Sequence, residues 1–199
     1  MFISPEYKKV CEEMIIRNLN NKNYVVGPNF MQGRVKEIIG FINQHKTPDS
    51  KILDIGSGAY MPIVLGATHA CDVVEMAGNI LEKSRWKGEF QVASCDSLPY
   101  EDKSMDIAIC TEVIEHLPYY EVVARTFQET ERVAKKWVIT TPRASKSGFR
   151  DTWNVEETHV QFFTTGDIRT MMRDLFPDLF RERKIRLKDV NHYVFVTRV

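Results

Sequence analysis

The chain has 199 residues, of which 43% are hydrophobic and 27% charged, as expected for a soluble globular domain with a sizeable core. Its 27 Lys and Arg balance 27 Asp and Glu, so no global electrostatic argument favours nucleic acid or an anionic membrane as a partner, although a local patch stays compatible. No run reaches membrane-spanning length and the start, MFISPEYKKV, has no apolar signal segment. We therefore expect a cytoplasmic protein with no membrane span.

The four cysteines are scattered along the chain and form no CxxC pair. Most of them lie in or beside apolar segments, where a thiol behaves as a small hydrophobic side chain. We expect buried free thiols in a reducing compartment rather than disulfides. The residues concerned are Cys11, Cys71, Cys95 and Cys110.

Two helices are predicted in the N-terminal region. The first covers residues 5–19, with Ser4 as a cap before Pro5. The second covers roughly residues 32–44 and has an apolar face. We expect region 1–46 to form a helical lid over the remaining domain, residues 47–199. Tyr24, Phe30 and Arg34 are pocket candidates in this lid, against the alternative of ordinary packing and solvated charge.

From Lys51 onward, short apolar segments alternate with helical ones, which predicts a parallel sheet covered on both faces. A last helix is expected at residues 167–176, and only three residues separate the two final strands, so these should pair as an antiparallel hairpin. The predicted fold is an α/β, doubly wound Rossmann-like sheet, mostly parallel, with an antiparallel C-terminal hairpin and N-terminal helices. The expected strands are residues 51–56, 71–76, 90–94, 105–110, 137–141, 183–188 and 192–198.

The first strand ends in an acid and a glycine loop, in the sequence KILDIGSGAY. Asp54 precedes Gly56 and Gly58, and such a loop between a strand and a helix is typical of nucleotide sites. The third glycine of a dinucleotide loop is missing, and there is no GxxxxGK[ST] loop for a triphosphate. An adenosine with a short polar tail therefore fits this loop better than NAD or ATP.

The next strand ends carry polar groups as well. We place Glu75 at the end of the second strand, where a carboxylate can accept both ribose hydroxyls. Asp96 follows the third strand and can accept from the exocyclic amine of adenine, and Thr111 and Glu112 follow the fourth. Each acid taken alone could equally be a helix cap or a solvated side chain. Their occurrence at successive strand ends favours a binding site.

The segments ILDIGSGA, VVEMAGNILEKSR, CDSLPYEDKSMDIAICTEVIEHLP, WVITTPR and HVQFFTTGDIRTMM together resemble the class I S-adenosylmethionine-dependent methyltransferases. The resemblance covers roughly residues 30–199 and implies S-adenosylmethionine as cofactor and S-adenosylhomocysteine as product. In this chain the glycine loop is shorter than in many members, because it turns at once to Ala59-Tyr60.

The resemblance also implies where the cofactor binds. Residues of the glycine loop would cradle its methionine part and ribose, and Glu75 would bind the ribose hydroxyls with Met76 against the adenine. Asp96 would meet the adenine amino group with Ser97 beside it. The implied cofactor-binding residues are Asp54, Gly56, Gly58, Glu75, Met76, Asp96, Ser97 and Thr111.

Catalytic candidates lie in the segment TEVIEHLPYY. His116 is a candidate general base, since the unperturbed pKa of histidine suits this role near neutral pH, and Glu112 is the second catalytic candidate. Glu112, Glu115 and His116 have helical spacing and, with His159, resemble the metal site of small-RNA 2′-O-methyltransferases. The alternative, which we favour, is that these groups form hydrogen bonds and close the pocket without metal, while Phe162 and Phe163 fill the core.

The expected acceptor is the O or N atom of a small molecule, sugar or lipid-like compound, with nucleic acid kept open. Methylation of a base amino group is disfavoured because no Asn/Asp-Pro-Pro-aromatic stretch follows the fourth strand. The loop at residues 143–157 could grip an anion or an aromatic ring, or be a surface loop anchored by its tryptophan. Two alternatives stay open: a metal-assisted RNA 2′-O-methyltransferase, and a non-catalytic cofactor-binding partner subunit. The loop residues concerned are Arg143, Lys146, Phe149, Arg150 and Trp153.

Overall fold

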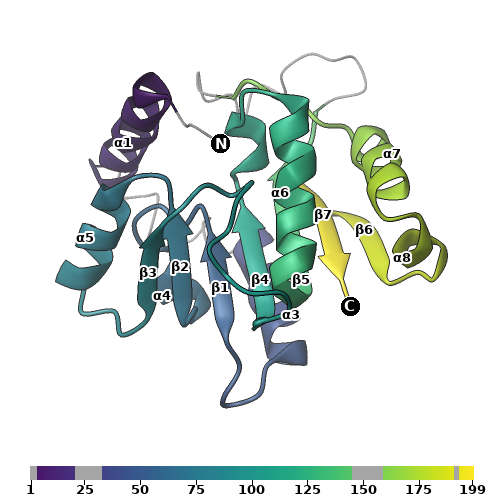
Figure 1. The fold of residues 1–199 in the computed structure, drawn as a ribbon, viewed down its shortest axis with the longest axis horizontal. Helices are drawn as coiled ribbons and strands as arrows, with labels where there is room; N and C mark the ends of the chain where they lie inside the picture. Colours follow the sequence, from purple (N-terminus) through teal and green to yellow (C-terminus); the bar gives the residue numbers. More distant parts are fainter. Residues whose placement is uncertain (1–3, 21–32, 145–158, 191–192) are drawn as a thin grey trace.

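The computed structural model describes residues 4–20, 33–144, 159–190 and 193–199. In these residues, seven strands form one sheet in the order β3-β2-β1-β4-β5-β7-β6 (Figure 1). The first five run parallel, and β7 pairs antiparallel with both β5 and β6. This confirms the predicted doubly wound sheet and its C-terminal hairpin. The strands are β1 Ile52–Ile55, β2 His69–Asp72, β3 Glu89–Val92, β4 Met105–Thr111, β5 Ala134–Pro142, β6 Ile185–Val190 and β7 Tyr193–Arg198.

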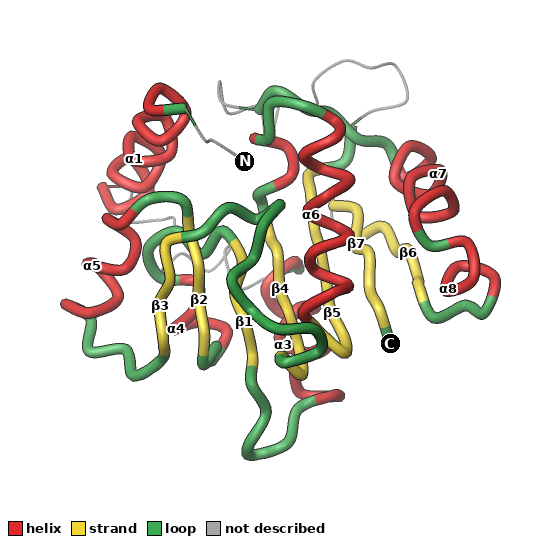
Figure 2. Tube along the Cα trace, viewed as in Figure 1, coloured by secondary structure: helices red, strands yellow, loops and turns green. Residues whose placement is uncertain are grey.

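Helices lie on both sides of this sheet (Figure 2). Both N-terminal helices that the sequence predicts are present, and the later one at 167–176 is present as α7. The described helices are α1 Pro5–Asn20, α3 Arg34–His45, α4 Met61–Leu65, α5 Glu75–Lys83, α6 Tyr120–Val133, α7 Thr165–Leu175 and α8 Pro177–Arg181, with a 3-10 turn, η1, at Ile114–His116. Within the described part of the chain, no helix is both long enough and apolar enough to cross a bilayer.

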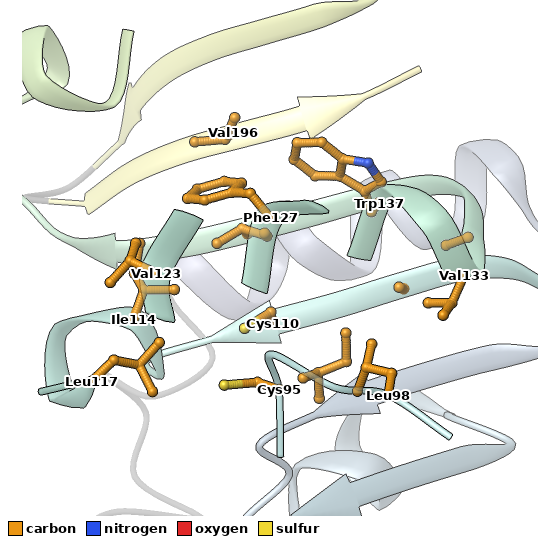
Figure 3. Close-up of a cluster of buried hydrophobic side chains, with 14 of the residues drawn as sticks. Cys95, Leu98, Cys110, Ile114, Leu117, Val123, Phe127, Val133, Trp137 and Val196 are labelled. Carbon is orange, nitrogen blue, oxygen red and sulfur yellow. The ribbon is translucent and has the colours of Figure 1, made fainter. Parts of the chain in front are cut away.

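The sheet is buried on both faces because its central strands alternate between two apolar clusters. Ala108 and Cys110 of β4 belong to the cluster under α6 and α7, which Figure 3 shows in close-up. Ile107 and Ile109 of the same strand point to the other face, against α3 and α4. Strands buried on both faces have near-continuous apolar sequences, which is why their positions were predictable.

The largest side chains of the core lie under α6. Phe127 and Trp137 are fully buried, with ring centroids 6.0 Å apart and planes inclined by 63°. The Trp137 indole Nε1 donates to Glu131 Oε2 at 2.7 Å, so burial of this ring leaves no indole donor unpaired. This packing fixes β4 and β5, whose carboxyl ends carry the candidate site.

The two N-terminal helices pack in different places. α3 contributes Val35, Ile38 and Ile42 to the core on one sheet face, so it is part of the sheet packing. α1 instead contacts α5 through the buried Ile15, beside Val74 and Ala77. In Figure 1, α1 lies at the carboxyl edge of the sheet, above α5. The division of the chain into a lid and a domain at residues 46 and 47 stays a prediction.

Three of the four cysteines are buried and Cys11 is half-buried, and all are free, as predicted. The second strand differs from its prediction. β2 begins at His69 and ends at Asp72, whereas we expected 71–76. The polypeptide turns into α5 directly after Val74, so Glu75 is the first residue of a helix and is exposed. The segment CDVVEM suggested a strand up to Met76 because Val73 and Val74 are apolar, but these two residues form the connection between β2 and α5.

Candidate functional site

The loop after β1 is held in place by the end of β2. The backbone N–H groups of Gly56 and Ser57 both donate to the Cys71 carbonyl, at 2.9 and 3.1 Å, and Gly58 N–H donates to Asp72 Oδ2 at 2.9 Å. Gly56 has φ 68°, and a Cβ there would lie 2.5 Å from Cγ2 of Val113. Only glycine fits this position, because both the backbone conformation and the close approach exclude a side chain.

Two polar side chains beside this loop are buried without a partner among the described residues. Asp54 is fully buried and neither of its carboxylate oxygens accepts a hydrogen bond, and the Ser57 hydroxyl is in the same state. Burial, together with the nearby Asp72 carboxylate, raises the pKa of Asp54 well above its usual range. Unsatisfied buried acceptors are costly, so they mark a place where a ligand with donor groups would be stabilised.

The acid at the end of β2 is Asp72. Its side chain is buried and accepts from the backbone N–H of Gly58 and, at 3.3 Å through Oδ1, of Val74. Burial raises its pKa, while these hydrogen bonds oppose the rise. Sequence analysis missed Asp72 because we extended the strand to Met76. The signal was present, since Asp72 ends an apolar run just as Asp54 does on the preceding strand.

Asp96, after β3, is already bonded to protein groups. Ser94 Oγ donates to its Oδ1, and Arg125 Nε from α6 donates to its Oδ2 at 3.2 Å. The Asp96 side chain is 1% exposed, and Arg125 therefore balances a buried charge. Ser97, by contrast, is exposed. The structure thus shows Asp96 as the anchor of the β3 loop to α6, and its contact with adenine stays a prediction.

The end of β4 is joined to α3 by an ion pair. Arg34 Nη1 lies 2.7 Å from Glu112 Oε1, and both side chains are largely buried. The Arg34 guanidinium also lies over the Tyr193 ring, 4.9 Å from its centroid. Glu112 has φ 57°, a left-handed conformation that is strained for a residue with a side chain. Thr111, just before it, shares a 2.8 Å hydrogen bond with Thr140.

The next turn brings three of the predicted residues together. Ligand atoms of Glu115, His116 and His159 all lie within 4.8 Å of one another. The two imidazole rings are 4.7 Å apart between centroids and inclined by 66°. Glu112 is not part of this group, because the chain turns at Glu112 and directs its carboxylate to Arg34. The sequence predicted one helical turn that carries Glu112, Glu115 and His116. The structure instead has Glu112 in a left-handed conformation, followed by the 3-10 turn η1.

Glu115 is the most buried member of this group, at 1% exposure. Its Oε2 accepts from Thr141 Oγ1 at 3.1 Å, whereas its Oε1 has no partner among the described residues. Burial, then the charge of Glu112, raise the pKa of Glu115 well above its usual range. A carboxyl group in this state can hold a proton at neutral pH or bind a cation that compensates its charge.

Several residues named from the sequence lie outside the described residues: Tyr24, Phe30, Lys146, Phe149, Arg150 and Trp153. Arg143 is described and pairs with Asp189, 3.2 Å away. Phe163 is buried, as predicted, but Phe162 is 41% exposed, so its predicted place in the core is wrong. The reason is the extended backbone here, which turns neighbouring side chains to opposite sides.

Comparisons with known proteins give one family match and several solved structures of similar fold. Residues 53–138 match the methyltransferase domain family. A comparison with curated protein sequences gives no match. Among solved structures, a SAM-dependent methyltransferase of Thermotoga maritima, described as a possible histamine N-methyltransferase, has a TM-score of 0.66 at 14% identity, covering 95% of this chain and 98% of that one.

Two further structures span the whole chain. Magnesium protoporphyrin IX methyltransferase from Synechocystis, solved with bound SAM, has a TM-score of 0.62 at 14% identity and covers 100% of each chain. A Haloferax volcanii methyltransferase in complex with the Trm112 activator has a TM-score of 0.66 at 11% identity, covering 100% of this chain and 99% of that one. At these identities the structures establish the fold, which this chain shares with S-adenosylmethionine-dependent methyltransferases. Within this fold, residues 53–138 match a methyltransferase domain, and these findings support S-adenosylmethionine as the cofactor.

Proposed function

We propose that this protein is an S-adenosylmethionine-dependent methyltransferase that transfers a methyl group to an O or N atom of a small-molecule, sugar or lipid-like acceptor. The observation that carries the proposal is the pair of unpartnered buried groups at the glycine loop, Asp54 and Ser57. S-Adenosylmethionine carries an ammonium group and two ribose hydroxyls. These groups can donate hydrogen bonds to the buried oxygens of Asp54 and Ser57, which have no donor among the described residues. The residues present therefore fit this cofactor.

This geometry supports a proposal for the residues that contact the cofactor. Asp54, Ser57 and the loop glycines would hold the methionine part. Asp72 is better placed than Glu75 to accept the ribose hydroxyls, because it lies at the buried strand end next to the loop, whereas Glu75 is exposed on α5. Met76, Asp96, Ser97 and Thr111 stay as proposed contacts from the resemblance, with Asp96 also bonded to Arg125.

When bound, the cofactor supplies an electrophilic methyl group on a sulfonium. The protein has to align the acceptor with it, exclude water and take up the acceptor's proton. His116 is the proposed base, since it lies on η1 beside the end of β4 and packs against His159. Glu112 is the proposed positioning residue: through its bond to Arg34 it fixes the turn that places His116.

The first test is a calorimetric titration of the protein with S-adenosylhomocysteine. We expect Asp72→Asn to weaken binding by about tenfold or more, because a charged acceptor of hydroxyl groups is lost. Glu75→Gln serves as the matched control and should bind like the wild type. Absence of binding to the wild type would contradict the proposal, and equal losses in both variants would contradict the ribose assignment.

A second candidate function is metal-assisted transfer to a ribose 2′-hydroxyl of RNA. The observation in its favour is the group formed by Glu115, His116 and His159, in which the buried Glu115 Oε1 has no hydrogen-bond partner among the described residues. Two imidazoles and a carboxylate suit a divalent transition metal, which could orient a hydroxyl and lower its pKa. The balanced charge of the chain gives no support for RNA as the acceptor.

Titration with Mn²⁺, followed by electron paramagnetic resonance of the free ion, tests this second candidate. Binding that His159→Asn abolishes, and that the control Glu101→Gln at an exposed acid outside this group leaves intact, would support a three-residue metal site. Failure of Mn²⁺ to bind at millimolar concentration would leave the metal-free mechanism. Cofactor binding without turnover on any acceptor would instead support a non-catalytic partner subunit.

A further inference from the structure

Two short segments lie side by side next to the histidine pair. One is Pro118–Tyr120, which follows η1 and leads into α6. The other is Val160–Phe162, which follows His159. The backbone N–H groups of Val160 and Gln161 both donate to the Glu115 carbonyl at 2.9 Å, and the Gln161 side chain donates to the Pro118 carbonyl at 3.4 Å. These bonds hold the second segment against the turn that carries Glu115 and His116.

Both segments expose large apolar side chains. Tyr119 is 65% exposed, Tyr120 48%, Val160 54% and Phe162 41%. We call these four residues, three of which are aromatic, the aromatic rim. Among the residues that the structure describes, the other strongly exposed large hydrophobic side chains are spread over α1, α4 and β3. Single exposed apolar residues are common, but a group of them beside a candidate active site is typical of a ligand-binding surface.

The charged groups that act on Tyr120 are negative. Burial and the carboxylates of Asp174 and Asp167, both on α7, raise the pKa of the Tyr120 phenol. Glu121 follows Tyr120 and is exposed. Such surroundings repel phosphate and carboxylate groups and favour a neutral or positively charged ligand. A tyrosine or phenylalanine ring also attracts a cation through its face.

We propose that the aromatic rim binds the methyl acceptor, and that this acceptor is a flat aromatic compound that is neutral or positively charged. This inference rests on the proposed methyltransferase function and names the substrate class for the same site. The rim contacts the ring of the acceptor, while His116 lies next to the group that receives the methyl. Nucleic acid is disfavoured as the ligand, because the carboxylates that act on Tyr120 would repel its phosphates.

The test uses two probes that share an indole ring and differ in charge: tryptamine, a cation, and indole-3-acetate, an anion. Each is titrated by calorimetry into the full-length protein saturated with S-adenosylhomocysteine. We expect tryptamine to bind more tightly than indole-3-acetate. Tyr119→Ser and Phe162→Ser should each weaken the binding of tryptamine by about fivefold, because each change removes one ring that contacts the cation.

Ile63→Ser and Val92→Ser are the matched controls, since both residues are exposed apolar positions far from the rim in sequence, at 43% and 52% exposure. Equal effects of rim and control variants, or tighter binding of indole-3-acetate, would overturn the inference. So would an RNA hexamer that binds more tightly than tryptamine and loses affinity in the rim variants. S-adenosylhomocysteine binding is measured in the same samples: if it persists while tryptamine fails, only this inference falls.

Discussion

At the scale of single residues, the site is marked by groups whose burial is not compensated within the protein. Asp54 is the clearest case, with two buried oxygens and no described partner. A buried carboxylate without a partner lowers stability, and a residue of this kind persists where a ligand completes its bonds. Stability without ligand and affinity for ligand should therefore change in opposite directions when this charge is removed.

We expect Asp54→Asn to raise the free energy of unfolding of the ligand-free protein by about 1 kcal/mol, since the buried charge is lost. The same change should weaken the binding of S-adenosylhomocysteine by about tenfold, because charge-assisted hydrogen bonds are lost. Urea denaturation and calorimetry measure the two quantities. Asp106→Asn is the control. Asp106 forms a 2.7 Å ion pair with Lys135, so loss of this pair should lower stability slightly and leave the affinity for S-adenosylhomocysteine unchanged. A destabilised Asp54→Asn would contradict this account.

Residue types at strand ends were predictable, but their partners were not. The sequence led to Asp54, Gly56 and the Glu115–His116 turn, because acids and glycines after apolar runs are visible in one dimension. It could not reveal that Glu112 pairs with Arg34, 78 positions earlier in the chain. That pairing depends on where α3 packs and on one left-handed backbone residue, and neither leaves a periodic signal.

At the scale of elements, strands buried on both faces were located well and connections less so. β4 and β5 match their predictions within a few residues because long apolar runs leave few alternatives. β2 was misplaced because it is only four residues long and its connection to α5 is also apolar. The position of this boundary decides whether Asp72 or Glu75 is proposed as the ribose acceptor, so one strand end can change a functional assignment.

The turn between β4 and η1 depends on the contact with α3. Arg34→Met should remove the ion pair from the largely buried Glu112, and we expect a loss of about 3 kcal/mol in the free energy of unfolding. Adding Glu112→Gln should restore part of this loss, because the charge that Arg34 balanced is then gone. A double-mutant cycle by urea denaturation gives the coupling between the two residues. Independent, additive effects of the two changes would contradict an ion pair that holds the turn.

At the scale of the whole molecule, α1 brings the N-terminal region close to the proposed cofactor site. Burial raises the pKa of Tyr7, and the Cys11 thiol and the Asp72 carboxylate add to this rise, so α1 lies close to the proposed ribose site. Its described apolar contacts are made by the buried Ile15 and the partly buried Cys11 and Leu19. A helix that packs through one such face can open locally, which is what a lid requires.

Ile15→Ala should therefore detach α1 without unfolding the sheet. We expect amide hydrogen exchange in residues 5–20 to accelerate by about tenfold or more, as expected when a buried isoleucine contact is lost. S-adenosylhomocysteine should dissociate faster in the same variant. Ile16→Ala is the matched control, because Ile16 is 45% exposed on the same helix. Unchanged exchange in Ile15→Ala, or an equal effect of Ile16→Ala, would show that α1 is not a lid.

The stability of the whole ligand-free protein should also depend on pH through its buried acids. Between the ordinary pKa of a carboxyl group and the raised pKa of Glu115, the folded protein binds more protons than the unfolded chain, so this group makes stability fall as pH rises. Asp106 and Glu129 have lowered pKa values and act in the opposite sense, losing their contribution as pH falls. The contribution of Glu115 can be isolated by comparing the wild type with Glu115→Gln.

We expect the free energy of unfolding of Glu115→Gln, relative to the wild type, to increase by about 1 kcal/mol or more from pH 5 to pH 8, because the variant has no charge to bury at the higher pH. Urea denaturation at several pH values measures this difference. A divalent cation bound at Glu115, His116 and His159 would compensate the charge, so Mn²⁺ should stabilise the wild type at pH 8 and leave Glu115→Gln unaffected. A difference that stays constant with pH would mean that Glu115 ionises freely in the folded protein and that its burial carries no functional information.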